Sequence, residues 1–182
     1  FNNEAKYGGG ISAVGDSSST NKNAIMNIYN SIIHNNTATY DGGGIYMKYA
    51  VAKIDNTKID NNQAGDDGGG IYAKGDSDTN RNAIMNIDNS IIQNNTATDD
   101  GGGMNIYNSI VTIKNTIFTT NEADDGGSKN NDGGGMRIDS SNVTMEYTNF
   151  TENTADDGGG MRIYDSVVTM KETIISNNNA RD

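Results

Sequence analysis

The chain has 182 residues, a net charge of −11, a hydrophobic fraction of 33% and no cysteine. The absence of cysteine excludes disulfides and cysteine-based metal sites, and the acidic balance makes nucleic acid an unfavourable partner. No apolar run approaches the roughly 20 residues of a membrane-spanning helix, so direct membrane insertion is not predicted.

Gly-Gly-Gly triplets divide the chain into about six similar turns. The triplets begin at Gly8, Gly42, Gly68, Gly101, Gly133 and Gly158. The basic turn is 25 or 26 residues long, and insertions at 15–23, 75–82 and 126–131 lengthen three of the turns. A repeat of this kind is the signature of a solenoid, in which insertions at corners leave the stacked turns intact.

Apolar residues alternate within each turn with period two, which predicts three short strands. The first strand follows the glycines, at 45–47, 71–73, 104–106, 136–138 and 161–163. The second has the form x-V-T-I-x, as at 111–113, 143–145 and 168–170. The third is a brief apolar step at Ile33, Ile59, Ile92, Phe118, Phe150 and Ile175. In this register the first and third residues of strand one, and all eight methionines, face inward.

Strands that always advance in the same direction stack in parallel, and parallel crossovers are right-handed in nearly all cases. The absence of proline fits, because each interior strand must donate hydrogen bonds to the ladders. The predicted fold is therefore all-β, a right-handed single-stranded parallel β-helix that forms one domain over residues 1–182.

Asn stands two residues before Ala at the corner that ends each turn. The Asn residues are Asn36, Asn62, Asn95, Asn121, Asn153 and Asn178, with Asn3 in the first partial turn. Asn tolerates left-handed backbone angles at a bend, and its amide can bond to the same amide one turn above. We predict a structural ladder of Asn side chains, with the small Ala filling the inner corner, and not a binding site.

The pairing of Gly-Gly-Gly-Ile or Gly-Gly-Gly-Met with Phe-x-x-Asn resembles the repeats of polymorphic outer-membrane proteins and related β-helix surface proteins. The matching segments are 42–45, 68–71, the triplets that end in Met104, Met136 and Met161, and the elements 118–121 and 150–153. The resemblance covers nearly the whole chain. It implies an extracellular or cell-surface location and an adhesin-like role.

Acidic residues precede most of the glycine triplets, at Asp41, Asp67, Asp100, Asp132 and Asp157. Stacked turns would set these carboxylates about 5 Å apart in a column. Calcium suits oxygen-only sites, so Asp67, Asp100, Asp132 and Asp157 are candidate calcium ligands. The preferred interpretation is a polar turn before glycines of positive φ, because the calcium-binding nonapeptide G-G-x-G-x-D is absent. No cofactor is required.

Outward-facing tyrosines are predicted on or just after the first strands, at Tyr46, Tyr72, Tyr107 and Tyr164. Exposed aromatic residues are enriched at interfaces, so these rings are candidate contacts for sugars or peptides. The equal alternative is that they form packing pairs between neighbouring turns.

Catalysis is an alternative function, because β-helices also carry polysaccharide lyases and hydrolases. Arg137 and Arg162 are predicted to stack near Asp139, where a basic residue beside acids can move a proton. Adjacent turns are nevertheless near copies, whereas an active site needs one turn that differs. His34 lies in an Asn corner and is interpreted as incidental, so no enzymatic activity is predicted.

The outward threonines of the second strand suggest an ice-binding face as a further alternative. Thr112, Thr144 and Thr169 are predicted to stack in one row. The earlier turns carry Asn27, Lys53 and Asn86 at the matching positions. Because an ice-binding plane needs a more regular array, this function is less favoured.

The chain starts within one Asn-x-Ala corner and stops just past another, without an amphipathic capping helix. If Asp182 is set against Phe1 of another copy, the triplet spacing across the joint is 32 residues, as between Gly101 and Gly133. The hypothesis is a non-catalytic extracellular structural or adhesive element that associates end to end, as copies or as one unit of a longer fibre. The alternative is a carbohydrate-binding or polysaccharide-lyase-like module with cell-surface or glycan ligands.

Overall fold

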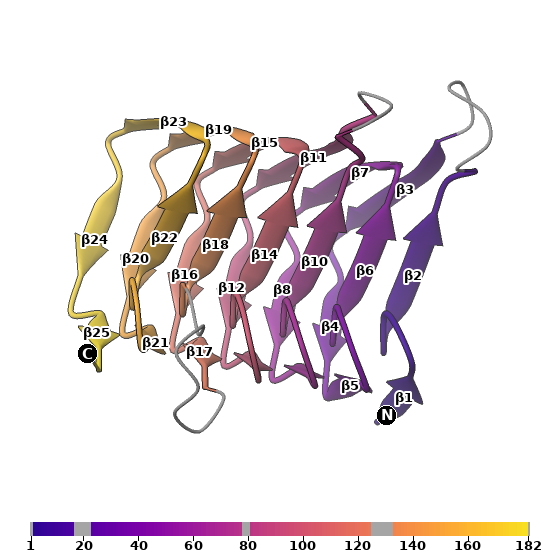
Figure 1. Ribbon diagram of the computed structural model, residues 1–182, viewed down its shortest axis with the longest axis horizontal. Helices are drawn as coiled ribbons and strands as arrows, with labels where there is room; N and C mark the ends of the chain where they lie inside the picture. The colour runs from indigo at the N-terminus through magenta and orange to yellow at the C-terminus, as the bar shows by residue number, and fades with distance from the viewer. Residues whose placement is uncertain (1, 17–22, 78–80, 125–132, 182) are drawn as a thin grey trace.

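The computed structural model describes residues 2–16, 23–77, 81–124 and 133–181. Within these ranges every regular element is a β-strand, and the coils follow one another along a single axis from the N-terminal to the C-terminal coil (Figure 1). All strand pairs in the four sheets are parallel, and each strand pairs with its equivalents in the coils before and after it. The predicted parallel β-helix is confirmed.

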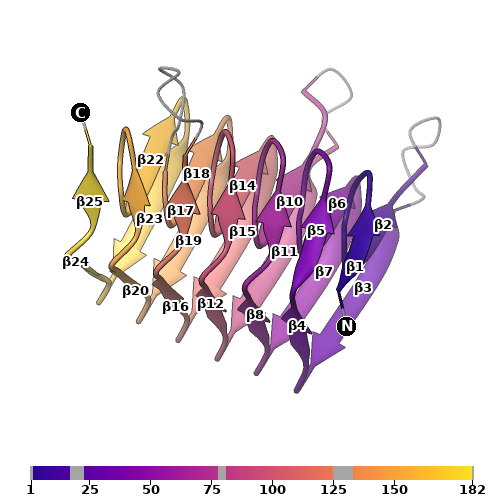
Figure 2. The same ribbon diagram turned by 90° about the horizontal axis from the view of Figure 1, so that it is seen from below.

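Four sheets run along the molecule, and each coil contributes one strand to each of them (Figures 1 and 2). The first sheet, which follows the glycines, contains β2 (Ile11–Val14), β6 (Ile45–Lys48), β10 (Ile71–Lys74), β14 (Met104–Tyr107), β18 (Met136–Asp139) and β22 (Met161–Tyr164). The second sheet contains β3 (Ala24–Tyr29), β7 (Ala50–Asp55), β11 (Ala83–Asp88), β15 (Ser109–Lys114), β19 (Asn142–Glu146) and β23 (Val167–Lys171).

The two remaining sheets have shorter strands. The third sheet contains β4 (Ile32–His34), β8 (Lys58–Asp60), β12 (Ile91–Gln93), β16 (Ile117–Thr119), β20 (Asn149–Thr151) and β24 (Ile174–Ser176). The fourth contains β1 (Asn3–Ala5), β5 (Asn36–Ala38), β9 (Gln63–Ala64), β13 (Thr96–Ala97), β17 (Glu122–Ala123), β21 (Thr154–Ala155) and β25 (Asn179–Ala180).

The fourth sheet corrects the prediction of three strands per turn. The Asn-x-Ala segment is itself a strand: in β5, Thr37 lies opposite Gln63, and Ala38 opposite Ala64. Two or three extended residues between two bends are enough to bond to the coils above and below. The segment that the sequence pattern marked as a corner is therefore the narrow fourth side of the coil.

The coil turns at residues with positive φ, which form four rows along the axis. The first glycine of each triplet has φ between +64° and +74°. A second row comprises Asn30, Asn56, Asn89, Asn115, Tyr147 and Glu172, and a third comprises Asn35, Asn61, Asn94, Thr120, Glu152 and Asn177. The fourth row includes Tyr49, Asn108, Ser140 and Asp165. The prediction that the ladder Asn itself adopts the left-handed angle is wrong, since that angle falls on the residue directly before it.

The glycine triplets combine two requirements. Gly42 has φ +69°, a conformation that costs glycine little. Gly44 is needed for space, because a Cβ there would lie 2.6 Å from the carbonyl oxygen of Gly70 and 3.1 Å from the side chain of Asn62. The expected positive φ is thus confirmed for the first glycine of the triplet, while the third makes room for the Asn ladder.

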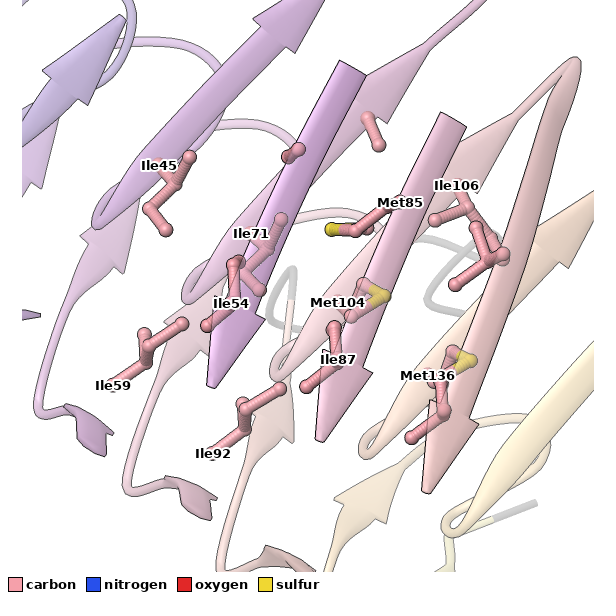
Figure 3. Packing of buried hydrophobic residues seen from close by; sticks show 14 of the residues in the cluster. Ile45, Ile54, Ile59, Ile71, Met85, Ile87, Ile92, Met104, Ile106 and Met136 are labelled. Carbon is pink, nitrogen blue, oxygen red and sulfur yellow. The ribbon is translucent and has the colours of Figure 1, made fainter. Parts of the chain in front are cut away.

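The apolar core is a set of columns inside the coils (Figure 3). Ile45, Ile71 and Met104 lie in register on the first sheet, and all three are fully buried. Phe118 and Phe150 on the third sheet stack with their ring centroids 4.6 Å apart. Stacked turns thus bury a continuous apolar filling although the chain has few apolar residues.

Thr120 is a β-branched residue held at φ +55°, where such residues are strained. Most other members of its row are Asn, which tolerates this conformation. We expect Thr120→Asn to raise the free energy of unfolding by about 1 kcal/mol, measured by urea denaturation. Thr119→Asn is the control, because Thr119 lies in β16 and its Oγ1 accepts a hydrogen bond from Thr151 at 3.1 Å. Equal stability of the two variants would contradict the assignment of strain.

Candidate functional site

The predicted Asn ladder is confirmed and links seven Asn side chains along the axis of the molecule. In each step an Nδ2 donates to the Oδ1 of the following Asn, at 2.7 to 3.0 Å, through Asn3, Asn36, Asn62, Asn95, Asn121, Asn153 and Asn178. Each interior amide is also tied to the backbone: Asn95 Nδ2 donates to the Ile59 carbonyl, and its Oδ1 accepts from the Asn62 backbone N–H. The five interior members, from Asn36 to Asn153, are buried, and the ladder acts as a structural element.

The Asp column lies beside the outer row of the first sheet, and arginines neutralise two of its described members. Arg137 Nη1 lies 3.3 Å from Asp100 Oδ2, and its Nη2 lies 3.0 Å from Asp139 Oδ2. Arg162 Nη1 lies 3.1 Å from Asp157 Oδ2. These carboxylates therefore use guanidinium groups as counterions.

The described ranges hold no group of three or more Asp, Glu, His or Cys side chains arranged to bind a metal ion. Asp67 is instead bonded within the protein, since its Oδ1 accepts the backbone N–H of Asp100 at 3.2 Å. Calcium binding by Asp67, Asp100 and Asp157 stays a prediction. The fourth candidate, Asp132, lies outside the described residues.

On the outer row beside the upstream half of the Asp column, Tyr46 and Tyr72 stand at the positions that Arg137 and Arg162 occupy further along the sheet. Burial, and after it the charges of Asp100 and Asp41, raise the pKa of the Asp67 carboxyl to about 7. Burial also raises the pKa of Asp41. The Asp67 carboxyl therefore keeps its proton to a higher pH than an ordinary aspartate does.

The predicted contact role of the tyrosines needs correction for two of the four. Tyr46 and Tyr72 are only 9% and 6% exposed, and their rings stack at 5.5 Å with an interplanar angle of 8°. They form a packing pair between coils, and burial raises the pKa of Tyr46 to about 12. Tyr107 is partly exposed, with Lys74 Nζ 5.4 Å from its ring centroid, and Tyr164 is exposed.

The other residues considered from the sequence lie on outer surfaces. Arg137 and Arg162 are in register, as predicted, and both are engaged with carboxylates. His34 is exposed and lies opposite Asp60 on the neighbouring strand. The outward row of the second sheet runs in register through Asn27, Lys53, Asn86, Thr112, Thr144 and Thr169.

One surface feature was missed from the sequence: a polar groove over the outer side of the fourth sheet, which we call the amide groove. It is an open depression of about 450 Å³, lined by Asn2, Glu4, Asn35, Thr37, Asn61, Asn62, Gln63, Asn94 and Thr96. The signal was present in the Asn-Asn doublets 35–36, 61–62 and 94–95, whose second members form the ladder inside. Their first members point the other way, because they occupy the left-handed bend.

Comparisons with known families agree with this geometry. The family model described as the right-handed β-helix region matches residues 44–181, and that of the Chlamydia polymorphic membrane protein repeat matches residues 30–48. Searches of the curated proteins and of the solved structures found no match. No helix among the described residues is long and apolar enough to cross a membrane. The first of these family models covers well over half of the sequence and describes parallel coils like those of the structure. The chain therefore belongs to the right-handed β-helix family.

Proposed function

We propose that the chain is a non-catalytic, rigid rod at the cell exterior, with a structural or adhesive role. The observation that carries this proposal is the continuity of the coils: four parallel sheets and one Asn ladder run through the described chain without a change of geometry. In such a solenoid the outward-facing positions repeat in every coil, which suits extended contact with a surface. The match to a polymorphic membrane protein repeat supports an exterior location.

The proposal includes end-to-end association into a filament. In the coil formed by β22 to β25, the inward residues Ile163, Met170 and Ile175 are 44%, 45% and 51% exposed. Their partners one coil earlier are fully buried. A further coil placed here would bury this apolar surface, whether it comes from a second copy or from more of the same repeat in a longer chain. A contact of this kind does not close on itself and generates a filament.

The Asn ladder supports the same polarity of stacking. Each Asn donates through Nδ2 to the next one along the chain, from Asn3 to Asn178. In a stacked copy that keeps the coil geometry, Asn178 would donate to Asn3 of that copy, so the ladder would continue in the same direction. The parallel strands would pair across the joint in the same way.

Two neighbouring isoleucines of β24 provide the test. Ile175 is 51% exposed on the inner row, and Ile174 is 55% exposed on the outer wall. We expect Ile175→Lys to abolish end-to-end association, because it places a charge in the joint, whereas Ile174→Lys is expected to associate like the parent chain. Sedimentation velocity and electron microscopy would measure particle length, and circular dichroism would confirm that both variants are folded. Short monodisperse rods for the parent chain, or equal association of the two variants, would count against the filament.

A further inference from the structure

The amide groove runs along the axis of the rod and crosses the strands of the fourth sheet. Its outward residues Glu4, Thr37, Gln63 and Thr96 are in register on four successive coils. Neighbouring strands in a sheet are about 4.8 Å apart, so the groove offers a polar side chain on each of four strands, spread over about 14 Å. A ligand that contacts all four strands is an extended polymer whose repeat length is close to the length of one sugar unit.

The groups that line the groove are uncharged amides and hydroxyls, with Glu4 at one end and no lysine or arginine among the described lining residues. Amides and hydroxyls both donate and accept hydrogen bonds, as do the hydroxyl groups of a sugar. A sulfated or carboxylated chain would instead require basic residues, and the chain as a whole carries a net charge of −11. This chemistry selects a neutral ligand.

The amides of the groove are held in place before any ligand arrives. Asn61 Nδ2 donates to Asn35 Oδ1 at 2.6 Å, and Asn94 Nδ2 donates to Asp60 Oδ1 at 2.9 Å. An Asn amide has two donor hydrogens and two acceptor lone pairs, so each of these bonds uses only part of its capacity. Side chains that are already ordered lose less conformational entropy on binding.

The backbone of the groove is not open to a peptide. Extended peptides commonly bind by adding a strand to an unpaired sheet edge. β5, β9 and β13 are each paired on both sides, so a ligand in the groove meets side chains and not free backbone groups. We propose that the amide groove binds a neutral, extended polysaccharide chain, which rests on the proposed adhesive function and assigns it a ligand class.

The same face changes character from the coil after Thr96 onward and so provides a control. There Arg181 forms ion pairs with Glu122 and with Asp124, the latter at 2.9 Å. Thr154 occupies the outward position of β21, which corresponds to that of Thr96 in β13. A bulky residue at Thr96 fills the groove, whereas the same residue at Thr154 lies beyond the residues that line it.

The experiment is isothermal titration of the full chain with cellohexaose, maltohexaose and mannohexaose. We expect at least one of these to bind, more tightly than its disaccharide because the groove spans four coils. Thr96→Trp is expected to weaken that binding at least tenfold, and Thr154→Trp is expected to leave it within twofold. Circular dichroism would verify that the two variants retain the fold of the parent chain.

The proposal is overturned if none of the three hexasaccharides binds, or if the two tryptophan variants bind equally well. It is also overturned if polygalacturonate, heparin oligosaccharides or an unstructured peptide binds the groove more tightly than the neutral sugars. None of these outcomes bears on the rod and its end-to-end association, because the Ile175 and Ile174 variants test those separately.

Discussion

Replacing Asn95 with alanine is expected to lower the free energy of unfolding by about 3 kcal/mol or more. The Asn95 side chain is fully buried at the middle of the ladder. Its removal leaves the backbone N–H and the side-chain amide of Asn62 without their acceptor. It also removes the donor to the Ile59 carbonyl and to Asn121 Oδ1. Each buried polar group left unpaired costs about 1 to 3 kcal/mol, and the alanine leaves a cavity as well.

Asn94→Gly is the matched control for this experiment. Asn94 is exposed, has φ +51°, and donates one hydrogen bond to Asp60. Glycine accepts the same backbone angle, so we expect a change in stability below about 0.5 kcal/mol. Urea denaturation followed by circular dichroism would compare the two variants. If Asn95→Ala were no less stable than Asn94→Gly, the ladder would contribute little to stability.

The ladder and the coil period were predictable because both are local repeats. Asn at one position and Ala two residues later recur in every turn, and period-two alternation is enough to place Ile45 and Met47 inside. Parallel stacking then brings equivalent residues of successive coils together. The number of sides was misjudged because a two-residue strand such as β9 has no alternation that a sequence pattern can detect.

The environment of the outer rows was not predictable from the pattern. Tyr72 and Arg137 occupy corresponding outer positions of the first sheet, yet Tyr72 is a buried packing partner of Tyr46 and Arg137 is a counterion of Asp100. Alternation shows which side of a strand a residue faces, but not which neighbours cover it. The amide groove was missed for a related reason, since it depends on bend geometry that turns one Asn of each doublet outward.

The stability of the chain is expected to fall as the pH rises from about 4 to about 7, because of Asp67. The pKa of this carboxyl is raised to about 7 in the folded chain, first by burial and then by the charges of Asp100 and Asp41. In the unfolded chain an aspartate ionises near pH 4. Between these values the folded state retains a proton that the unfolded state has lost. The contribution of Asp67 to the free energy of unfolding is therefore fully present below about pH 4. It decreases by up to about 1.4 kcal/mol per pH unit as the pH rises from about 4 to about 7, and is constant above pH 7.

Asp67→Asn is expected to remove this pH dependence and to be more stable than the parent chain at pH 8, because the amide is neutral and its Oδ1 can still accept the Asp100 N–H. At pH 4 the two chains should differ little. Asp165→Asn removes the same charge from an exposed bend with φ +43°, where Asn is equally suited, and should leave the slope between pH 4 and 7 unchanged. Denaturation midpoints at several pH values would measure all three chains. Equal slopes for the parent chain and Asp67→Asn would show that the half-buried Asp67 carboxyl does not set the pH response of the rod.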